Sequence, residues 1–177
     1  MTTRPRPRFT GVRTHIDPIG RFTFRYPTGW HQFELEEERE GVMYAPEASN
    51  PLTFFAVWAT KLETSIVMED ADDLREGIEQ GFTQLPEFTV VSSSEATYGN
   101  LLKFERIFTF RDDQVIRKRK LWILYVDVWQ LVVTFQGETP EEYDHWLPMG
   151  NYCLSTFNVP AELWFATDRD LNRTIGS

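Results

Sequence analysis

The sequence has few of the side chains that build metal centres and disulfide frameworks. Its 177 residues include one cysteine, Cys153, and three histidines, His15, His31 and His145. A single cysteine cannot form an intrachain disulfide, and no two histidines have the i, i+4 spacing of a helical zinc site. We therefore expect no metal and no cofactor, although His15 and Asp17 share one side of an extended segment and could hold a surface ion.

Recognisable catalytic patterns are also missing. Cys153 and His145 lie eight positions apart in one expected helix, or about 12 Å, which is too far for a thiol–base contact of about 3 Å. There is no nucleophile elbow and no phosphate-binding glycine loop. The acidic run 70–73 lacks the glycine and the distal glutamate of an EF-hand and fits a helix start better. We expect no catalytic residues.

Long apolar runs and an excess of positive charge are absent as well. No stretch approaches the roughly 20 apolar residues of a membrane span, and residues 1–16 lack the apolar core of a signal peptide. Acidic residues outnumber basic ones by 27 to 18, which gives a net charge of −9 and disfavours nucleic acid and anionic membranes as partners. We expect a cytoplasmic protein without membrane insertion.

Aromatic side chains are abundant, at 15% of residues. One domain with a substantial core is expected at this length. Apolar residues alternate with polar ones over 22–26, the period of a half-buried strand. Pro27 suits the second position of a following turn and Gly29 its fourth. Trp30 should then fold back against the strand, so that Tyr26, Pro27, Gly29 and Trp30 form a structural corner.

Beyond the corner, the hydrophobic pattern predicts two helices among many strands. Further strands are expected at 32–37, 41–45, 52–60, 88–97, 101–111, 115–126 and 129–135, with a hairpin at 112–114. Short links between neighbouring strands favour antiparallel pairing. The predicted class is therefore α+β, with a central, largely antiparallel sheet and helices packed on its faces.

The two predicted helices cover 70–85 and 139–157. Gly77 and Gly81 lie on one side of the first helix and could let it sit close to the sheet. Thr139 is a candidate cap for the second helix, with proline at the first helical position and a capping-box glutamate at position 142. Pro148 predicts a kink or a break within it.

Taken together, these pieces resemble the PsbP-like superfamily. The resemblance covers roughly 12–158 and is carried by the helix at 70–85, the long late hairpin, the ending LVVTFQGETPEEYDHW, and Phe22, Phe24, Tyr26, Pro27, Gly29 and Trp30. Its members include an extrinsic photosystem subunit, DcrB-like proteins, Eag chaperones of secretion effectors and a Ran-binding import factor. The resemblance implies an antiparallel sheet with helices on its faces, binding or adaptor work rather than catalysis, and a bacterial origin.

The sequence RKRK at 117–120 is the most concentrated basic cluster. On a strand, Arg117 and Arg119 face one way and the two lysines the other. With Lys103, Arg106 and Arg111 on a neighbouring strand, they could form a positive band that grips an acidic protein segment. The alternative, which we favour, is a solvated hairpin tip whose charges pair with nearby acids.

The ends of the chain lie outside the expected domain of 12–158. Residues 1–11 alternate arginine with proline and are expected to form a flexible tail. The C-terminal extension 159–177 carries Leu163, Trp164, Phe165 and Leu171, which are costly to leave in water. We expect this extension to dock on the sheet in cis, or on a second copy in a homodimer.

These observations favour a non-enzymatic binding or adaptor module that engages a protein partner. A chaperone for a secretion effector is one concrete form, in which an apolar groove shields a hydrophobic helix. The alternative is a small-ligand binder or enzyme with a pocket between helix and sheet. Arg117, Arg119, Trp164 and Phe165 are the candidate partner contacts.

Overall fold

Seven strands form one antiparallel sheet in the computed structural model, which describes residues 4–35 and 39–165. The strand order is β3-β4-β5-β9-β8-β7-β6, and every neighbouring pair is antiparallel. The strands are β3 (His31–Phe33), β4 (Glu40–Ala45), β5 (Phe54–Lys61), β6 (Thr89–Tyr98), β7 (Leu101–Asp112), β8 (Val115–Val126) and β9 (Trp129–Gly137). The α+β class and the antiparallel sheet expected from the sequence are confirmed.

Two short loops join the long strands β7, β8 and β9. The expected hairpin turns at Asp113 and Gln114, and a second hairpin turns at Asp127 and Val128. Asp113 has φ 57° and Asp127 has φ 50°, a left-handed conformation that aspartate adopts more readily than most side chains. The local sequence therefore determines where this part of the sheet turns.

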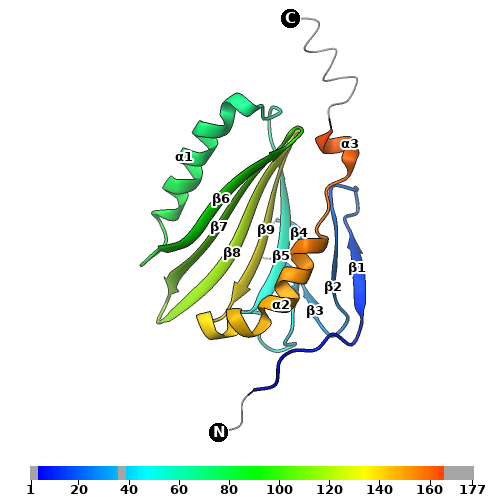
Figure 1. Cartoon of the computed structure of the whole chain (residues 1–177), viewed down its shortest axis with the longest axis vertical. Coiled ribbons are helices and arrows are strands. Elements are labelled where there is room, and N and C mark those ends of the chain that lie inside the picture. The colour runs from blue at the N-terminus through cyan, green and yellow to red at the C-terminus, as the bar shows by residue number, and fades with distance from the viewer. Residues whose placement is uncertain (1–3, 36–38, 166–177) are drawn as a thin grey trace, which may run out of the picture.

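The two faces of the sheet are covered by different helices (Figure 1). Helix α1 (Ala71–Phe82), preceded by the single turn η1 (Met68–Asp70), packs on a cluster that includes Phe104 and Phe108. Helix α2 (Pro140–Thr156) packs on the opposite face, in a cluster that includes Val133 and Phe135. Because side chains alternate across each strand, the sheet contributes to two separate cores.

A two-stranded ribbon completes the α2 side. Strand β1 (Val12–Ile16), which the sequence analysis missed, pairs with β2 (Thr23–Pro27) and with no other strand of the described chain. The expected strand at 22–26 therefore belongs to this ribbon and not to the main sheet. Phe22 and Phe24 are each 1% exposed, in the same cluster as α2. The ribbon thus covers the part of the core that lies beside α2.

The details of α1 differ from the expectation. Helix α1 does not approach the sheet closely at Gly77 and Gly81, contrary to the expectation. A Cβ built at either position would have no neighbour within 4 Å. Apolar side chains about one turn of the helix apart, Ile78 and Phe82 among them, make the contact with the sheet instead. Both glycines border open space.

Helix α2 continues through Pro148, so the expected break is not found. Thr139 caps the helix through a 3.2 Å hydrogen bond from the Glu142 amide. Pro148 lies on the exposed side, whereas Met149 and Gly150 next to it are buried. Packing of that buried side holds the helix together across the lost hydrogen bond. Within the described residues, no helix is long and apolar enough to cross a membrane.

Candidate binding site

The corner turns one residue later than the sequence suggested. The Trp30 amide donates to the Pro27 carbonyl at 3.0 Å, so Pro27 is the first residue of the turn, not the second, and Gly29 is the third, not the fourth. Trp30 is 7% exposed and belongs to the α2-side core. Its ring meets Trp146 of α2, with centroids 6.2 Å apart.

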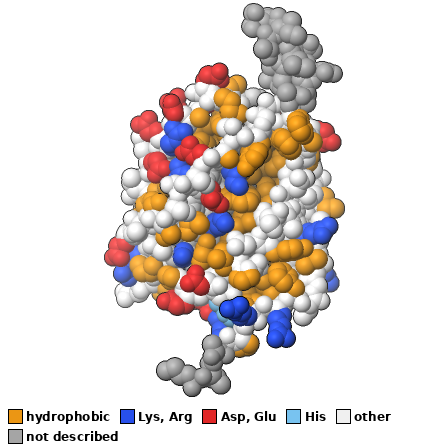
Figure 2. All heavy atoms as spheres, viewed as in Figure 1, with side chains coloured by type: hydrophobic (Ala, Val, Ile, Leu, Met, Phe, Trp, Pro, Cys, Tyr) orange, Lys and Arg blue, Asp and Glu red, His pale blue; other side chains and the backbone are white. Residues whose placement is uncertain are grey.

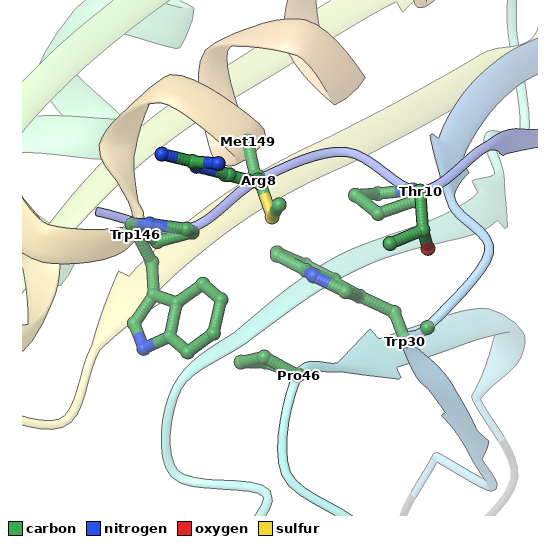
Figure 3. A pocket seen from close by; sticks show the side chains of 9 residues that line it. Arg8, Thr10, Trp30, Pro46, Trp146 and Met149 are labelled. Carbon is green, nitrogen blue, oxygen red and sulfur yellow. The ribbon is translucent and has the colours of Figure 1, made fainter. Parts of the chain in front are cut away.

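A cavity of about 250 Å³ opens beside this pair of tryptophans. Trp30 comes from the turn after β2, Pro46 from the loop after β4, and Trp146 and Met149 from α2 (Figure 3). The remaining lining residues belong to the N-terminal segment and the corner: Pro7, Arg8, Thr10, Pro27 and Gly29. The cavity is therefore made by four segments that are distant in sequence, and its walls are aromatic and apolar.

The described part of the tail, residues 4–11, makes contacts that we did not expect. The Arg4 guanidinium pairs with the Glu142 carboxylate and lies over the Trp146 ring, 5.8 Å from its centroid. Phe9 meets Tyr152 of α2 edge to face at 5.1 Å. The expectation that an Arg/Pro tail cannot pack therefore does not hold for this part of it.

A second, larger hollow lies between α1 and the sheet. We call this hollow the α1 groove; its volume is about 460 Å³. It is lined by Leu74, Gly77, Ile78, Gly81, Phe82 and Leu85 on the helix side, with Asp73 at its end, and by Ile123, Tyr125 and Gln130 on the sheet side. Its surface is mainly apolar, and the two helix glycines keep it wide.

Ion pairs fasten α1 on the side away from the α1 groove. Arg75 bonds Glu95 of β6 at 2.6 Å, and Arg106 of β7 bonds Glu79 at 2.9 Å. Charged side chains accordingly gather over α1 and β6 in the space-filling view (Figure 2). The helix is thus held along the β6–β7 side, while its β8–β9 side is left open as the α1 groove.

Few groups in the α1 groove could take part in acid–base chemistry. The Tyr125 hydroxyl accepts a 3.0 Å hydrogen bond from Gln130, and burial raises the pKa of Tyr125. Asp73 is exposed. The α1 groove therefore offers mainly apolar side chains, with one phenol and one exposed carboxylate at its polar positions.

The basic cluster at 117–120 is divided between the two faces of the sheet. Arg117 and Arg119 pair across the sheet with residues of the α1-side core, Phe110 and Phe108. Arg106 shares that face but is paired with Glu79. Lys103 lies on the other face, with its Nζ atom 3.6 Å from the Trp122 ring centroid. No continuous positive band forms from these residues. The expected pairing with nearby acids is found, since Arg117 pairs with Asp112 and Lys120 with Glu105, but Arg117 is only 7% exposed and so is not at a solvated tip.

Arg117 and Arg119 have different partners. Arg117 pairs with Asp112 at 2.7 Å and donates to the Glu138 carbonyl at 2.9 Å. Arg119 donates to the Gln136 side-chain oxygen and has no carboxylate partner among the described residues. Burial lowers the pKa of Arg119 to about 10, in spite of Asp112 nearby. Arg117 is thus buried and Arg119 partly buried, and both guanidiniums bind groups of the sheet or its adjoining loop.

The described part of the C-terminal extension docks in cis. After Val159, the single turn α3 (Ala161–Trp164) brings Trp164 against the α2-side core. The Trp164 carbonyl accepts from the Asn100 amide at 2.7 Å, in the turn between β6 and β7. Phe165 stacks on Trp164 at 4.1 Å and is 55% exposed. Leu171 lies outside the described residues.

The residues considered for metal or nucleophilic chemistry have structural partners instead. Asp17 is held by Arg21 in a buried ion pair at 2.7 Å, while His15 Nδ1 lies 3.0 Å from the Tyr44 hydroxyl, so the two do not share an ion site. Cys153 is fully buried, and burial raises the pKa of its thiol. Within residues 4–35 and 39–165, no three His, Cys, Asp or Glu side chains are placed to hold a metal ion.

Comparison with known proteins defines the fold. No family model and no curated protein matches the sequence. Among solved structures, the cyanobacterial PsbP protein (CyanoP) of Synechocystis sp. PCC 6803 superposes with a TM-score of 0.61 at 8% identity, covering 90% of this chain and 99% of that one. LpqN of Mycobacterium tuberculosis, involved in cell envelope biogenesis, gives 0.56 at 14% identity, with 84% and 92% covered.

A third similar structure is the Ran-binding protein Mog1p of Saccharomyces cerevisiae. Its TM-score is 0.54 at 9% identity, and the superposition covers 84% of this chain and 95% of Mog1p. The chain therefore has the PsbP/Mog1p-like fold, as the resemblance seen in its sequence implied. At such low identity the likeness concerns the fold alone, because one fold can carry unrelated functions.

Proposed function

We propose that this chain is a non-enzymatic binding module that holds an apolar segment of a protein partner in the α1 groove. The observation that carries the proposal is the open space at Gly77 and Gly81. A glycine inside a helix costs about 1 kcal/mol relative to alanine, and here neither glycine is needed for close packing. Space for a partner's side chains explains why the helix lacks side chains at these two positions.

The charge around the α1 groove indicates the kind of partner. Asp73 lies at the end of the α1 groove and forms no ion pair with a described residue, and the whole chain carries a net charge of −9. An apolar segment flanked by lysine or arginine would match the apolar lining, the Asp73 carboxylate and the net negative charge of the chain. An amphipathic helix is a suitable form, because helices commonly bind in grooves through one apolar face.

The fold supports a binding role but does not choose the partner. Mog1p is described as Ran-binding, which is one case of protein binding on this fold. A chaperone that shields a hydrophobic helix of a secretion effector in the bacterial cytoplasm would be a specific form of the same activity. A small apolar ligand is the second candidate, because the groove volume of about 460 Å³ lies within the usual range for ligand pockets.

The test compares a filled groove with an unfilled one. Gly77→Leu places a side chain in the open space of the α1 groove, and Gln80→Leu adds the same side chain on the exposed surface of α1. The probes are a synthetic Leu/Lys amphipathic helix, the same peptide with glutamate for lysine, and the neutral dye Nile red. Binding is followed by fluorescence anisotropy with the full-length chain.

We expect the Leu/Lys peptide to bind the natural chain and the Gln80→Leu variant equally. Gly77→Leu should weaken binding at least about tenfold, since a filled site loses the peptide's apolar contact. The Leu/Glu peptide should bind poorly, because Asp73 and the net charge of −9 repel it. Binding of Nile red without binding of either peptide would favour the small-ligand alternative. Equal peptide binding by all three proteins would show that the α1 groove is not the site.

A further inference from the structure

The cavity between Trp30 and Trp146 is already partly filled by the chain's own N-terminal segment. Residues 4–10 read RPRPRFT, and Pro7, Arg8 and Thr10 line the cavity. Figure 3 shows Arg8 and Thr10 above the two indole rings, with Met149 between them. We call residues 4–10 the N-terminal strap. It lies on a surface that α2, the loop after β4 and the corner build together.

The surface under the strap has two complementary features. Its floor is aromatic, with Trp30, Trp146 and Tyr152 contributing rings. Its rim is acidic, because Glu142 pairs with Arg4 and Glu47 lies 3.8 Å from the same guanidinium. Aromatic floors hold extended proline-containing segments, and acidic rims hold arginine. Alternating Arg and Pro matches both features at once.

The strap is held only by side chains and only at its surface. Pro7 is its one partly buried residue, and the others are exposed, including Phe9 at 44%. Within the described chain, the first main-chain hydrogen bond after the strap is from the Thr28 amide to the Gly11 carbonyl. A segment held in this way can leave its seat without disrupting a strand or a helix.

One hydrogen-bond donor under the strap, the Trp30 indole N–H, is not bonded by the strap. Trp30 Nε1 is buried and has no hydrogen-bond partner among the described residues, although Trp30 lines the cavity. A buried indole N–H normally has an acceptor. An extended segment that brought a backbone carbonyl to this N–H would make a hydrogen bond that the strap does not make. The chain's own segment is therefore an incomplete ligand for this surface.

From these contacts we propose that the Trp30–Trp146 surface is a recognition site for an extended Arg/Pro segment of a partner protein. The N-terminal strap is its built-in competitor, and binding in trans requires that the strap leave. This site is separate from the α1 groove and does not depend on what the groove binds. The tethered strap acts at an effective concentration in the mM range. A segment with the same contacts therefore competes with the strap only at mM concentrations, and a partner that binds at lower concentration needs better contacts.

Trypsin offers a direct measure of strap release in the full-length chain. Trypsin does not cut an arginine–proline bond, so Arg8–Phe9 is the only tryptic bond within the strap. Arg8 lines the cavity, and cutting should therefore be slow while the strap is seated. The competitor is the capped peptide RPRPRP, in which every internal arginine precedes proline and is itself resistant. The control peptide is EPEPEP, which keeps the prolines and reverses the charge.

We expect mM concentrations of RPRPRP to raise the rate of cleavage at Arg8–Phe9 several-fold, as followed by mass spectrometry, and EPEPEP to have no effect. Glu142→Gln keeps the acceptor for the Trp146 indole but removes the charge that holds Arg4. This variant should be cut faster without peptide and should respond less to RPRPRP. A matched change at an exposed aromatic far from the strap, Tyr98→Ala, should behave as the natural chain does.

Two results would overturn the proposal. If RPRPRP leaves the cleavage rate unchanged while Glu142→Gln raises it, the strap is seated but the surface does not accept a segment in trans. If the natural chain and Glu142→Gln are cut equally fast, the strap does not occupy the surface. Acceleration by both peptides alike would show that charge plays no part and would equally reject an Arg/Pro partner.

Discussion

The indole ring of Trp146 meets that of Trp30 edge to face, with centroids 6.2 Å apart and the ring planes at 86°. Replacing Trp30 by alanine removes this pair and leaves a cavity where corner and helix meet. We expect Trp30→Ala to lower the free energy of unfolding by about 3–5 kcal/mol, the usual cost of truncating a core aromatic. Guanidinium denaturation measures the change.

Trp30→Phe separates packing from hydrogen bonding at the same position. Phenylalanine keeps most of the apolar contact and removes the N–H that has no partner in the described part of the chain, so this variant should lose clearly less stability than Trp30→Ala. The exposed Tyr98→Ala serves as a baseline. If Trp30→Ala melts like the natural chain, the corner is not part of the core.

Gly99→Ala should release the C-terminal segment. Gly99 has φ 57°, and a Cβ there would overlap the Trp164 carbonyl oxygen. The left-handed backbone alone costs about 1–2 kcal/mol for a residue with a Cβ, and the clash adds to it. We expect a lower melting temperature and a red-shifted tryptophan emission as Trp164 enters water. Gly29→Ala is the control, since that position has free space and no positive φ.

Gly77→Ala and Gly81→Ala should raise the stability of the chain, in contrast to Gly99→Ala. Neither added methyl group meets a neighbour, and each gains about 1 kcal/mol of helix propensity. We expect both melting temperatures to rise and the increments to add in the double variant. A fall in stability at either position would mean that α1 lies closer to the sheet than described, and the argument for an open groove would fail with it.

His15 should make stability depend on pH near neutrality. Burial lowers the pKa of His15, and Asp17 opposes this shift only partly. The unfolded chain therefore binds the proton more tightly than the folded chain, and the His15 contribution is complete above the unfolded pKa of about 6.5 and is lost as pH falls below it. Unfolding of the natural chain and of His15→Gln, compared from about pH 5 to pH 8, isolates this effect.

The stability difference between these two proteins should shift in favour of the natural chain as pH rises through that window. His145 titrates in both proteins and cancels in the comparison. A difference that is flat with pH, or one that grows toward acid, is incompatible with a histidine that is buried in its neutral form.

Stability should not depend on metal ions. No described cluster of three potential ligands exists, and the carboxylate of Asp17 is occupied by Arg21. Thermal melts in chelator, in calcium and in zinc should superimpose. A rise of several degrees with either ion would reveal a site that includes residues outside the described ranges.

Local patterns in the sequence were enough to predict most of the elements. The extended segment 115–126 and the three-residue break at 112–114 before it predicted β8 and its hairpin, and the Thr139 cap marked the start of α2. The strand β1 was missed because its residues are almost all exposed and show no period. The ribbon could not be separated from the sheet, since strand pairing between distant segments leaves no local signal.

The binding surfaces were harder to predict than the fold. The two glycines of α1 were noticed, but whether they face the sheet or open space depends on how the helix lies across β8 and β9. Arg117 and Arg119 were considered partner contacts because charge suggests exposure, yet one ends in an ion pair and the other among core rings. The surface under the N-terminal strap could not be predicted, because it is formed by Glu142 and Trp146, which are more than a hundred residues away in sequence.

The pairing of β5 with β9 at the centre of the sheet has a consequence for how the chain folds. It joins Lys61 to Trp129 and Phe54 to Gln136, whereas β6 to β9 pair in sequence order through short turns. Closing such a long loop costs entropy before any contact repays it. The β6–β9 meander can therefore form early, and β3, β4 and β5 join it in a late step that completes both cores at once. Until that step, the central strand β9 is an open edge, and newly made chains are most exposed to misassociation there.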